Sequence, residues 1–321
     1  MTAPTYDDVI LAAERIEGHA VRTPLLHSDA LDEIIGAETH FKAECLQHVG
    51  AFKYRGARNR LTAMSDAERA GGVVAFSSGN HAQGVARAAK ELDIDAVIVM
   101  PNDAPKVKVD GVRRDGATLV TYDRLTESRE EIAAFIAARD GRTLVPSYDD
   151  PYIIAGQGTV GLEIARSGLA FDALVTCMGG GGLCAGIALA LAGESPDTDI
   201  FGAEPTHYND HQMSLRSGTR TRIATDAPPT LCDAIMTPMP GEITWPINKR
   251  HLTDVFDVSD ADCLQAMKLA KRHLGVTLEP GGAAAMAAVV TGHLPERYRR
   301  VAVVLSGGNV DPAILERAMT S

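Results

Sequence analysis

Short runs of apolar residues, many of them β-branched, alternate with longer segments of helical periodicity along most of the chain. From residue 72 onward these runs predict strands at 73–76, 96–100, 118–122, 143–146, 173–178, 199–204, 252–258 and 301–305. Continuous apolar strands separated by helices are typical of parallel sheets that are covered by helices on both faces. The pattern therefore predicts an α/β fold.

The predicted strands fall into two groups, and the segment SYDDP at 147–151 is the expected crossing between them. No internal repeat or low-complexity linker interrupts the pattern. In sheets of this kind ligands bind at the carboxyl ends of the strands, so the loops that follow the strands are where chemistry is expected.

Two of these loops have the form of anion-binding sites. After the strand at 73–76, Ser77, Ser78, Gly79 and Asn80 lie at the predicted start of an Ala-rich helix, where free backbone N–H groups favour a carboxylate or phosphate. After the strand at 173–178, the glycines at 179–182 allow the backbone to approach a phosphate closely. The alternatives are that the first loop only caps its helix and that the second is a structural turn.

Ser306 and Lys53 are two further candidates for the site that these loops would form. Ser306 follows the last predicted strand in LSGGN, where it either faces the site or caps the next helix. Lys53, in VGAFKYRGA at 49–57, shares one face of a predicted helix at 52–64 with Ala57, Leu61 and Met64. A lysine in that position either extends its ammonium group to water or is a neutral amine that takes part in a reaction. With two anion loops, it indicates a pyridoxal phosphate (PLP) site, because the PLP aldehyde reacts with a neutral lysine amine.

Composition narrows the classes of partner. A formal net charge of −11 over 321 residues disfavours binding to nucleic acid or to an anionic membrane. No apolar run approaches the roughly 18 residues of a membrane span, and the N-terminal stretch is acidic where a secretory signal would be basic. We therefore expect a cytoplasmic protein. The five cysteines are scattered without a CxxC pair, so we expect them to be reduced and buried.

The motifs FKAECLQHVGAFKYRGARNRL, FSSGNHAQGVA, IIAGQGTVGLEI, CMGGGGLCAGIA, TLEPGGAA and VLSGGNVD occur in this order along the chain. Together they resemble the serine/threonine dehydratase and serine racemase branch of the fold-type II PLP enzymes, which includes threo-3-hydroxyaspartate dehydratases. The resemblance implies two doubly wound parallel-sheet domains of the tryptophan synthase β type. Residues 1–71 and 150–321 would form the large PLP-binding domain and residues 72–149 the small domain, with the active site in the cleft between them. A homodimer is usual in this family.

The resemblance also implies roles for individual residues. Lys53 would bond covalently to the cofactor aldehyde, and Phe52 would pack beside the ring. Asn80 would bond the phenolic oxygen of the ring, Ser306 would face the pyridine nitrogen, and Ser78 would act on the opposite face of the cofactor. The residues expected to hold the phosphate are Gly179, Gly180, Gly181, Gly182 and Leu183. Those expected to bind a small amino-acid substrate are Ser77, Ser78, Gly79, Asn80, His81 and Arg129.

A divalent cation, Mg²⁺ or Ca²⁺, is a further implication of the resemblance. Glu204 and Asp210, with the main-chain carbonyl of Tyr208 between them, have the spacing of relatives that bind such an ion, and hard cations prefer oxygen ligands. The alternative is a solvated acidic loop.

Substrate identity stays open among three reactions. We expect β-elimination of L-threonine or L-serine to a 2-oxo acid and ammonia, with 3-hydroxyaspartate dehydration and serine racemisation as alternatives. Arg129 matches a position that approaches a second substrate carboxylate in some relatives, although it is equally suited to a helix-surface ion pair. Ala234 replaces a glycine that is usual in the family, and His48 stands where a small or apolar residue is more common.

Overall fold

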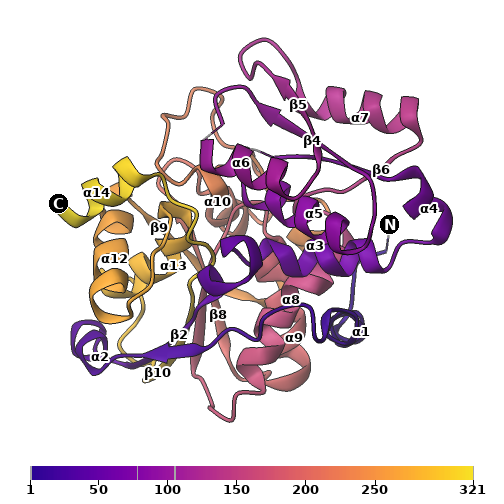
Figure 1. Cartoon of the computed structure of the whole chain (residues 1–321). Helices are drawn as coiled ribbons and strands as arrows, with labels where there is room; N and C mark the ends of the chain where they lie inside the picture. The colour runs from indigo at the N-terminus through magenta and orange to yellow at the C-terminus, as the bar shows by residue number, and fades with distance from the viewer. Residues whose placement is uncertain (1, 78, 105, 321) are drawn as a thin grey trace.

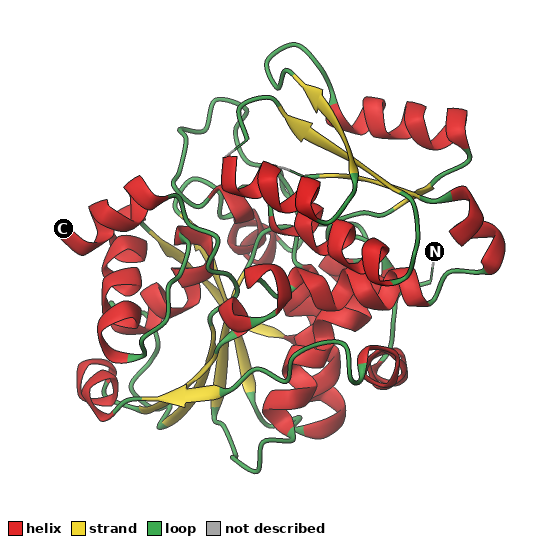
Figure 2. Ribbon diagram, in the orientation of Figure 1, coloured by secondary structure: helices red, strands yellow, loops and turns green. Residues whose placement is uncertain are grey.

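A computed structural model describes residues 2–77, 79–104 and 106–320 of the chain (Figures 1 and 2). The helices are α1 (Tyr6–Ile16), α2 (Asp29–Ile35), α3 (Lys53–Thr62), α4 (Asp66–Gly71), α5 (Asn80–Glu91), α6 (Lys106–Arg114), α7 (Arg129–Asp140), α8 (Pro151–Ala165), α9 (Gly182–Glu194), α10 (Asp210–Ser217), α11 (Thr244–His251), α12 (Asp260–His273), α13 (Pro280–Val290) and α14 (Pro312–Thr320), with short 3₁₀ turns η1 (Glu44–Leu46), η2 (His48–Gly50) and η3 (Asp233–Ile235). The strands are β1 (Leu25–His27), β2 (Glu38–Lys42), β3 (Val73–Phe76), β4 (Ala96–Pro101), β5 (Thr118–Tyr122), β6 (Thr143–Leu144), β7 (Ala173–Cys177), β8 (Asp199–Pro205), β9 (Leu252–Val258) and β10 (Arg300–Val304).

The larger sheet has the strand order β1-β2-β10-β7-β8-β9. Every pair in it is parallel except β1 with β2 at one edge. Helices α8 and α9 lie together on one side of this sheet, and α12 and α13 lie on the other (Figure 1). Strand β7 is buried along its whole length, which explains its uninterrupted apolar sequence.

Strands β1 and β2 are the two that the apolar pattern did not predict. Strand β1 has only three residues, and β2 alternates partly and fully buried positions in the sequence ETHFK. Short edge strands of mixed polarity carry little periodic signal. The large sheet is therefore parallel with one antiparallel edge.

The smaller sheet has the order β5-β4-β3-β6 and is parallel throughout. Its strands bury alternate residues on opposite faces. Ala75 and Ile98 belong to the cluster that packs against α5, whereas Val74 and Val97 belong to the cluster that packs against α7. Two parallel-sheet units are thus present as predicted, and the division of the chain at residues 72 and 149 remains a prediction.

Helix α3 packs against both α8 and α5, and so lies between the two units (Figure 1). The predicted apolar face holds, because Ala57, Leu61 and Met64 are all buried. The helix is not amphipathic, however, since Arg55 and Asn59 are fully buried as well. A helix in this position has no face left for water.

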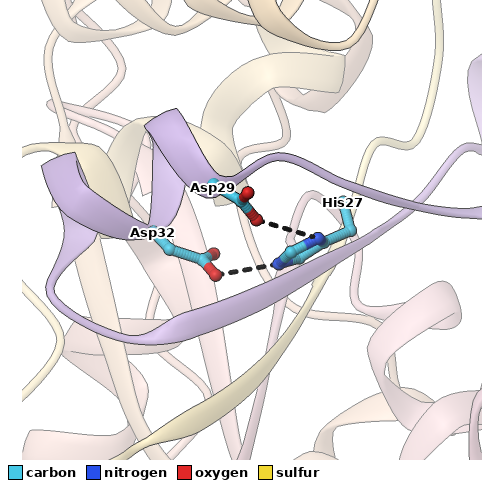
Figure 3. A group of neighbouring side chains, drawn as sticks. All are labelled: His27, Asp29 and Asp32. Carbon is cyan, nitrogen blue, oxygen red and sulfur yellow. Dashed lines mark hydrogen bonds and ion pairs between the residues drawn. The ribbon is translucent and has the colours of Figure 1, made fainter.

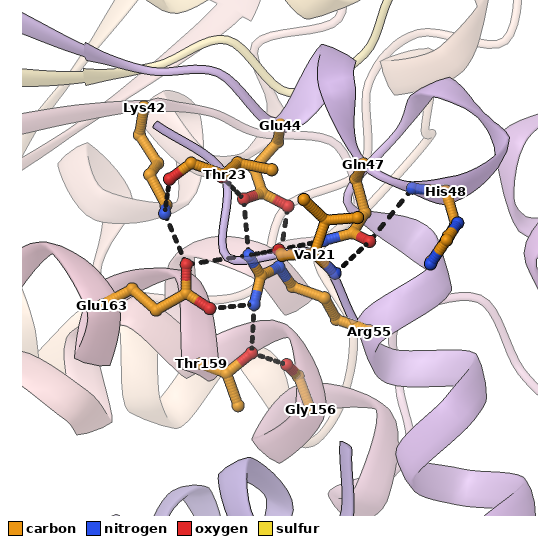
Figure 4. Close-up of polar contacts among 10 residues, drawn as sticks. All are labelled: Val21, Thr23, Lys42, Glu44, Gln47, His48, Arg55, Gly156, Thr159 and Glu163. Carbon is orange, nitrogen blue, oxygen red and sulfur yellow. Dashed lines mark hydrogen bonds and ion pairs between the residues drawn. The ribbon is translucent and has the colours of Figure 1, made fainter. Parts of the chain in front are cut away.

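The buried charge of Arg55 is compensated by two carboxylates (Figure 4). Its guanidinium donates to both oxygens of Glu44 at 2.8 Å and to both oxygens of Glu163 at 2.6 and 3.0 Å. Lys42 extends the network, because its Nζ donates to Glu163 and to the carbonyl of Thr23. Bidentate pairs of this kind fix the orientation of both partners. The network therefore joins the start of α3 to α8 and to the end of β2.

The five cysteines are buried and free, as expected. Within the ranges described above, no helix is long and apolar enough to cross a bilayer.

We expect Arg55→Met to lower the free energy of unfolding by about 3–5 kcal/mol, because it leaves Glu44 as an uncompensated buried charge. Urea denaturation measures this change. The matched control is Arg139→Met, which breaks the exposed pair with Asp140 and should change stability by less than about 1 kcal/mol. Equal effects of the two substitutions would contradict a special role for the buried network.

Candidate active site

A cavity of about 450 Å³ opens between the two sheets. That volume is in the range of small-ligand sites. Its wall includes most of the residues selected from the sequence: Phe52, Lys53, Ser77, Gly79, Asn80, His81, Arg129, Gly179, Gly180, Gly181, Gly182, Leu183, Ala234 and Ser306. Ser78 lies outside the described residues. Glu204, Tyr208 and Asp210 are not in the wall; Glu204 and Asp210 form a separate group with His211.

Lys53 is the first residue of α3, and its side chain lies in the cavity rather than reaching toward bulk water. Its Nζ donates to the carbonyl of Ser147 at 2.6 Å and lies 5.1 Å from the centre of the Phe52 ring. No carboxylate among the described residues forms an ion pair with it. Burial therefore lowers the pKa of Lys53 to about 8. An amine in this state is available as a base or nucleophile near neutral pH.

The glycine loop joins β7 to α9 and must be free of side chains. A Cβ on Gly180 would lie 2.3 Å from the ring of Tyr148, and one on Gly182 would lie 2.9 Å from the Cβ of that tyrosine. Gly181 has φ +88°, a conformation that other residues rarely adopt. The backbone of the loop therefore faces the cavity directly, with the N-terminus of the 13-residue α9 behind it.

The side-chain amide of Asn80 has a single orientation that the hydrogen bonds determine. Asn309 Nδ2 donates to the carbonyl of Val49 at 2.7 Å and to Asn80 Oδ1 at 2.8 Å. The oxygen of Asn80 is thereby occupied, and Asn80 Nδ2 donates to the carboxylate of Glu279. One N–H of Asn80 remains, and the cavity is the space that it adjoins.

Ser306 is buried next to Cys177. The thiol of Cys177 donates to Ser306 Oγ at 3.1 Å, so the hydroxyl proton of Ser306 is free to point elsewhere. Burial raises the pKa of the Cys177 thiol to about 11, so the cysteine is a neutral donor. Ser306 thus offers an uncharged hydroxyl to whatever occupies this end of the cavity.

The first turn of α5 offers backbone N–H groups and no cationic side chain. Gly79 precedes the helix, and its N–H donates to Ser77 Oγ at 3.2 Å. His81 donates Nε2–H to the carbonyl of Val145 at 2.9 Å, which leaves Nδ1 as a buried acceptor without a partner. Burial and the charge of Lys53 lower the pKa of His81 to about 3. A carboxylate here would be bound by main-chain groups and not by the imidazole.

Arg129 begins α7 and contributes a cation to the cavity wall. Its guanidinium lies over the ring of Phe76, 5.4 Å from the ring centre, and Nε donates to Glu130 at 2.8 Å. The aromatic ring and the ion pair both restrict the guanidinium. Arg129 is therefore both a cavity residue and a member of a surface ion pair.

The predicted metal ligands come together behind the glycine loop. Glu204, Asp210 and His211 are fully buried, with one ligand atom from each within 4.8 Å of the others. Both carboxylate oxygens of Asp210 lack a hydrogen-bond partner. His211 Nδ1 lies 3.2 Å from Glu204 Oε1, and the two carboxylates raise the pKa of His211 to about 9 against the opposing effect of burial. Tyr208 lies in the same turn, where its N–H donates to the carbonyl of Pro205.

A second group of possible ligands is an ordinary surface ion pair (Figure 3). The two ring nitrogens of His27 lie 3.7 Å from Asp29 and 2.8 Å from Asp32. Asp32 also accepts the N–H of Thr39 at 2.8 Å. The carboxylates already have partners, and all three residues lie at or near the surface.

Several residues that line the cavity, and Asn309 behind Asn80, were missed by the sequence analysis. Glu279 and Asn309 lie inside the quoted motifs TLEPGGAA and SGGNVD, but the roles of these two residues appear only when their contacts with Asn80 are known. Tyr148 and Lys108 had no sequence signal. His48, whose purpose was open, lies outside the cavity wall, where it bonds the carbonyl of His19 and packs edge-on against Tyr54.

Comparison with known proteins agrees with this geometry. The model of the pyridoxal-phosphate dependent enzyme family matches residues 16–307. This chain belongs to that family. It is 45% identical to the L-threo-3-hydroxyaspartate ammonia-lyase of a Pseudomonas species and 41% identical to the serine racemase of Schizosaccharomyces pombe, over 97% of this chain and 97% and 96% of the relatives. The structure of maize serine racemase superposes with a TM-score of 0.93 at 35% identity, covering 99% of this chain and 98% of that one.

PLP fits the residues present. The side-chain-free loop at 179–182 suits the phosphate, and the amine of Lys53 suits the aldehyde. The remaining N–H of Asn80 and the hydroxyl of Ser306 are uncommitted and adjoin the same cavity. The α/β fold of two parallel-sheet domains predicted from the sequence, and the cofactor, are confirmed.

We expect Lys53→Met to abolish the covalent bond between protein and cofactor. Borohydride reduction followed by peptide mass spectrometry should find PLP on Lys53 of the parent protein and nowhere on the variant. Lys90→Met, which alters a half-exposed lysine paired with Asp115, is the control and should label normally. Labelling of another lysine in the parent protein would contradict the assignment.

The same variant gives a second readout in protein stripped of cofactor. Lys53 has a folded pKa near 8 and an ordinary value of 10.5, so its burial destabilises the fold below pH 8, and this penalty disappears as the pH approaches 10.5. We therefore expect Lys53→Met to melt at a higher temperature than the parent at pH 7 and at an equal temperature near pH 10.5. A difference that is independent of pH would show that the lysine is not desolvated.

Proposed function

We propose that this protein is a PLP-dependent ammonia-lyase whose substrate is 3-hydroxyaspartate. The observation that carries the proposal is the position of the Arg129 guanidinium in the cavity wall. It lies over the ring of Phe76, the residue that precedes Ser77. The other side-chain cations of the wall besides Lys53 are Lys108, which pairs with Asp233 and Glu279, Arg220, which pairs with Glu242, and Arg222. A substrate with one carboxylate needs only the loop, whereas a dicarboxylate also uses the guanidinium.

The similarity to known proteins supports this choice over our first expectation of L-threonine or L-serine. The Pseudomonas relative is named for L-threo-3-hydroxyaspartate, and the match spans nearly the whole of both chains. Serine racemase stays as the second candidate, since that name belongs to another relative of similar identity and to the maize structure.

The chemistry follows from the positions of a few side chains. Bound PLP supplies an electron sink for the carbanion formed at Cα. The amine of Lys53, which has a lowered pKa, removes the Cα proton. Asn80 and the neutral hydroxyl of Ser306 would hold the ring, and an uncharged hydroxyl would not enforce protonation of the pyridine nitrogen, which favours β-elimination. The β-hydroxyl would leave as water with a proton equivalent to the one removed from Cα. The released enamine would tautomerise to an imine, which one water molecule hydrolyses to a 2-oxo acid and ammonia.

The substrate would lie with its α-carboxylate at the first turn of α5. The backbone N–H groups there carry the partial positive charge of the helix, His81 is neutral, and the ammonium group of Lys108 lies against the backbone of Gly79. The β-carboxylate would then point to Arg129 and exchange with Glu130 as its ion-pair partner. Ser78 is proposed to act on the Cα proton from the face opposite Lys53.

We further propose that Glu204 and Asp210, with the carbonyl of Tyr208, hold Mg²⁺ or Ca²⁺. The buried oxygens of Asp210 form no hydrogen bond, although Oδ2 lies 3.5 Å from His211 Nδ1, and a divalent cation would be coordinated by the oxygens of both carboxylates. The site lies behind the glycine loop, because His211 contacts Asn248 and Asn248 donates to the carbonyl of Gly181. Such an ion would stabilise the glycine loop and take no part in the bond-breaking steps.

We expect Arg129→Gln to lower kcat/KM for L-threo-3-hydroxyaspartate by about 10- to 100-fold, the equivalent of one charged hydrogen bond. Any activity toward L-serine should be unchanged, because serine has no second carboxylate. A coupled assay of 2-oxo acid release, run on L-threonine, both serine enantiomers and the 3-hydroxyaspartate stereoisomers, measures both quantities.

The matched control for this test is Arg124→Gln, which removes an exposed arginine of the same unit that pairs with Asp103. It should leave both activities unchanged. Turnover of L-threonine and L-serine with none of hydroxyaspartate would refute the proposed substrate, and conversion of L-serine to D-serine as the main reaction would favour the racemase.

We expect Mg²⁺ or Ca²⁺ to raise the melting temperature of chelator-treated protein, and Asp210→Asn to abolish this rise, because ligands of the native state stabilise it. The control Asp226→Asn alters an exposed acid and should respond like the parent protein. A melting temperature that does not depend on either ion would count against the metal site.

A further inference from the structure

Lys108 is a buried cation in the cleft that neither the sequence motifs nor the proposed reaction uses. It lies on α6, in the small-sheet unit, and its side chain is only 3% exposed. Its Nζ is 3.1 Å from Asp233 Oδ2 and 3.8 Å from Glu279 Oε2, and both carboxylates belong to the large-sheet unit. Lys108 thus connects the two units by charge across the cleft.

The position of Lys108 is adjacent to the expected substrate loop. A Cβ on Gly79 would lie 3.1 Å from Lys108 Nζ, so the ammonium group is packed directly against the backbone that begins α5. Its neighbour Lys106, two residues earlier on the same helix, is 88% exposed and pairs only with Asp110. The sequence KVKVDGVRR does not distinguish these two lysines.

Glu279 is the partner through which Lys108 reaches the cofactor site. The carboxylate of Glu279 is 2% exposed, and its Oε2 forms no hydrogen bond. The cation that lies beside this oxygen is Lys108, with Nζ at 3.8 Å. Oε1 accepts from Asn80 Nδ2. Because Asn309 occupies the oxygen of Asn80, the amide cannot turn over to suit a protonated Glu279.

We infer that Lys108 is a positioning residue: its charge keeps the Glu279 carboxylate ionised, and the ionised carboxylate holds the Asn80 amide with one N–H toward the phenolic oxygen of PLP. The inference rests on the proposed role of Asn80, but it is independent of which amino acid the enzyme uses.

The charged groups near Glu279 determine the direction in which each substitution should move its pKa. Burial and the charge of Asp233 raise the pKa of Glu279, whereas Lys108 and the hydrogen bond from Asn80 lower it, and the net result is a pKa of about 7. The thiol of Cys177 also lies near but is neutral in this range. Removing Lys108 should therefore move the protonation of Glu279 to higher pH, and removing the charge of Asp233 should move it to lower pH.

The experiment is a pH titration, from about 5.5 to 9.5, of the visible absorption of the substrate-free holoenzyme. We expect a transition near pH 7 in the parent protein, shifted upward by about one pH unit or more in Lys108→Met. Lys108→Arg, which keeps the charge, should restore the parent midpoint. Asp233→Asn should shift it downward, and it provides the test if Lys108→Met does not fold, because Asp233 is partly exposed.

Glu279→Gln is the control that separates an electrostatic role of Lys108 from a purely structural one, because it removes the carboxylate that titrates. Neither the transition nor its shift should occur in Glu279→Gln or in Glu279→Gln with Lys108→Met. Lys106→Met removes the same charge from an exposed position of α6 and should titrate like the parent protein. A Lys108→Met protein with a lower melting temperature but an unshifted midpoint, or an Asp233→Asn midpoint that moves upward, would overturn the inference. A parent protein that shows the transition and its shifts but does not turn over hydroxyaspartate would refute the proposed substrate and leave the inference intact.

Discussion

The burial of Arg55 between Glu44 and Glu163 is the interaction on which the geometry of the cavity depends. It fixes the start of α3 against α8 and the end of β2, and Lys53 is only two residues away. The two cations of this helix have opposite environments. Arg55 has two carboxylates and stays charged, whereas Lys53 has a carbonyl and an aromatic ring, so burial is the main cause of its lowered pKa.

Some buried polar side-chain atoms form no hydrogen bond. They occur in several parts of the described chain, for example in Arg58 and Arg142, but the acids and the histidine among them lie at the site. Asp210 and Glu279 retain carboxylate oxygens without hydrogen bonds, and His81 retains a ring nitrogen. Buried polar atoms are rarely left in this condition unless a ligand or ion satisfies them. These atoms lie in the cavity wall or directly behind the glycine loop, which is where a cofactor, a substrate or a cation would be held.

The family accounts for the cofactor, and the cavity wall accounts for the choice of substrate. Lysine, glycine loop, Asn80 and Ser306 serve any β-elimination or racemisation that uses PLP, so they do not distinguish a hydroxyaspartate lyase from a serine racemase. Arg129 differs from them because, in the function proposed here, only a substrate with a second carboxylate would use it. The family therefore constrains the reaction class, whereas the choice of hydroxyaspartate depends on the proposed role of this one guanidinium.

Much of the fold could be predicted from the sequence alone, because the sequence patterns of strands and glycine loops are local. Buried parallel strands are continuous apolar runs, and a glycine loop between a strand and a helix is recognisable by itself, so the α/β fold and the phosphate loop could be predicted. Strands β1 and β2, the full burial of α3 and the roles of Lys108 and Tyr148 could not. The contacts of Asn80 join residues 199 and 229 positions apart, and nothing in the letters KVK separates a buried lysine from an exposed one. Only the tertiary structure decides which of two identical side chains lies within reach of a buried carboxylate, because the electrostatic effect depends on distance and desolvation and not on neighbours along the chain.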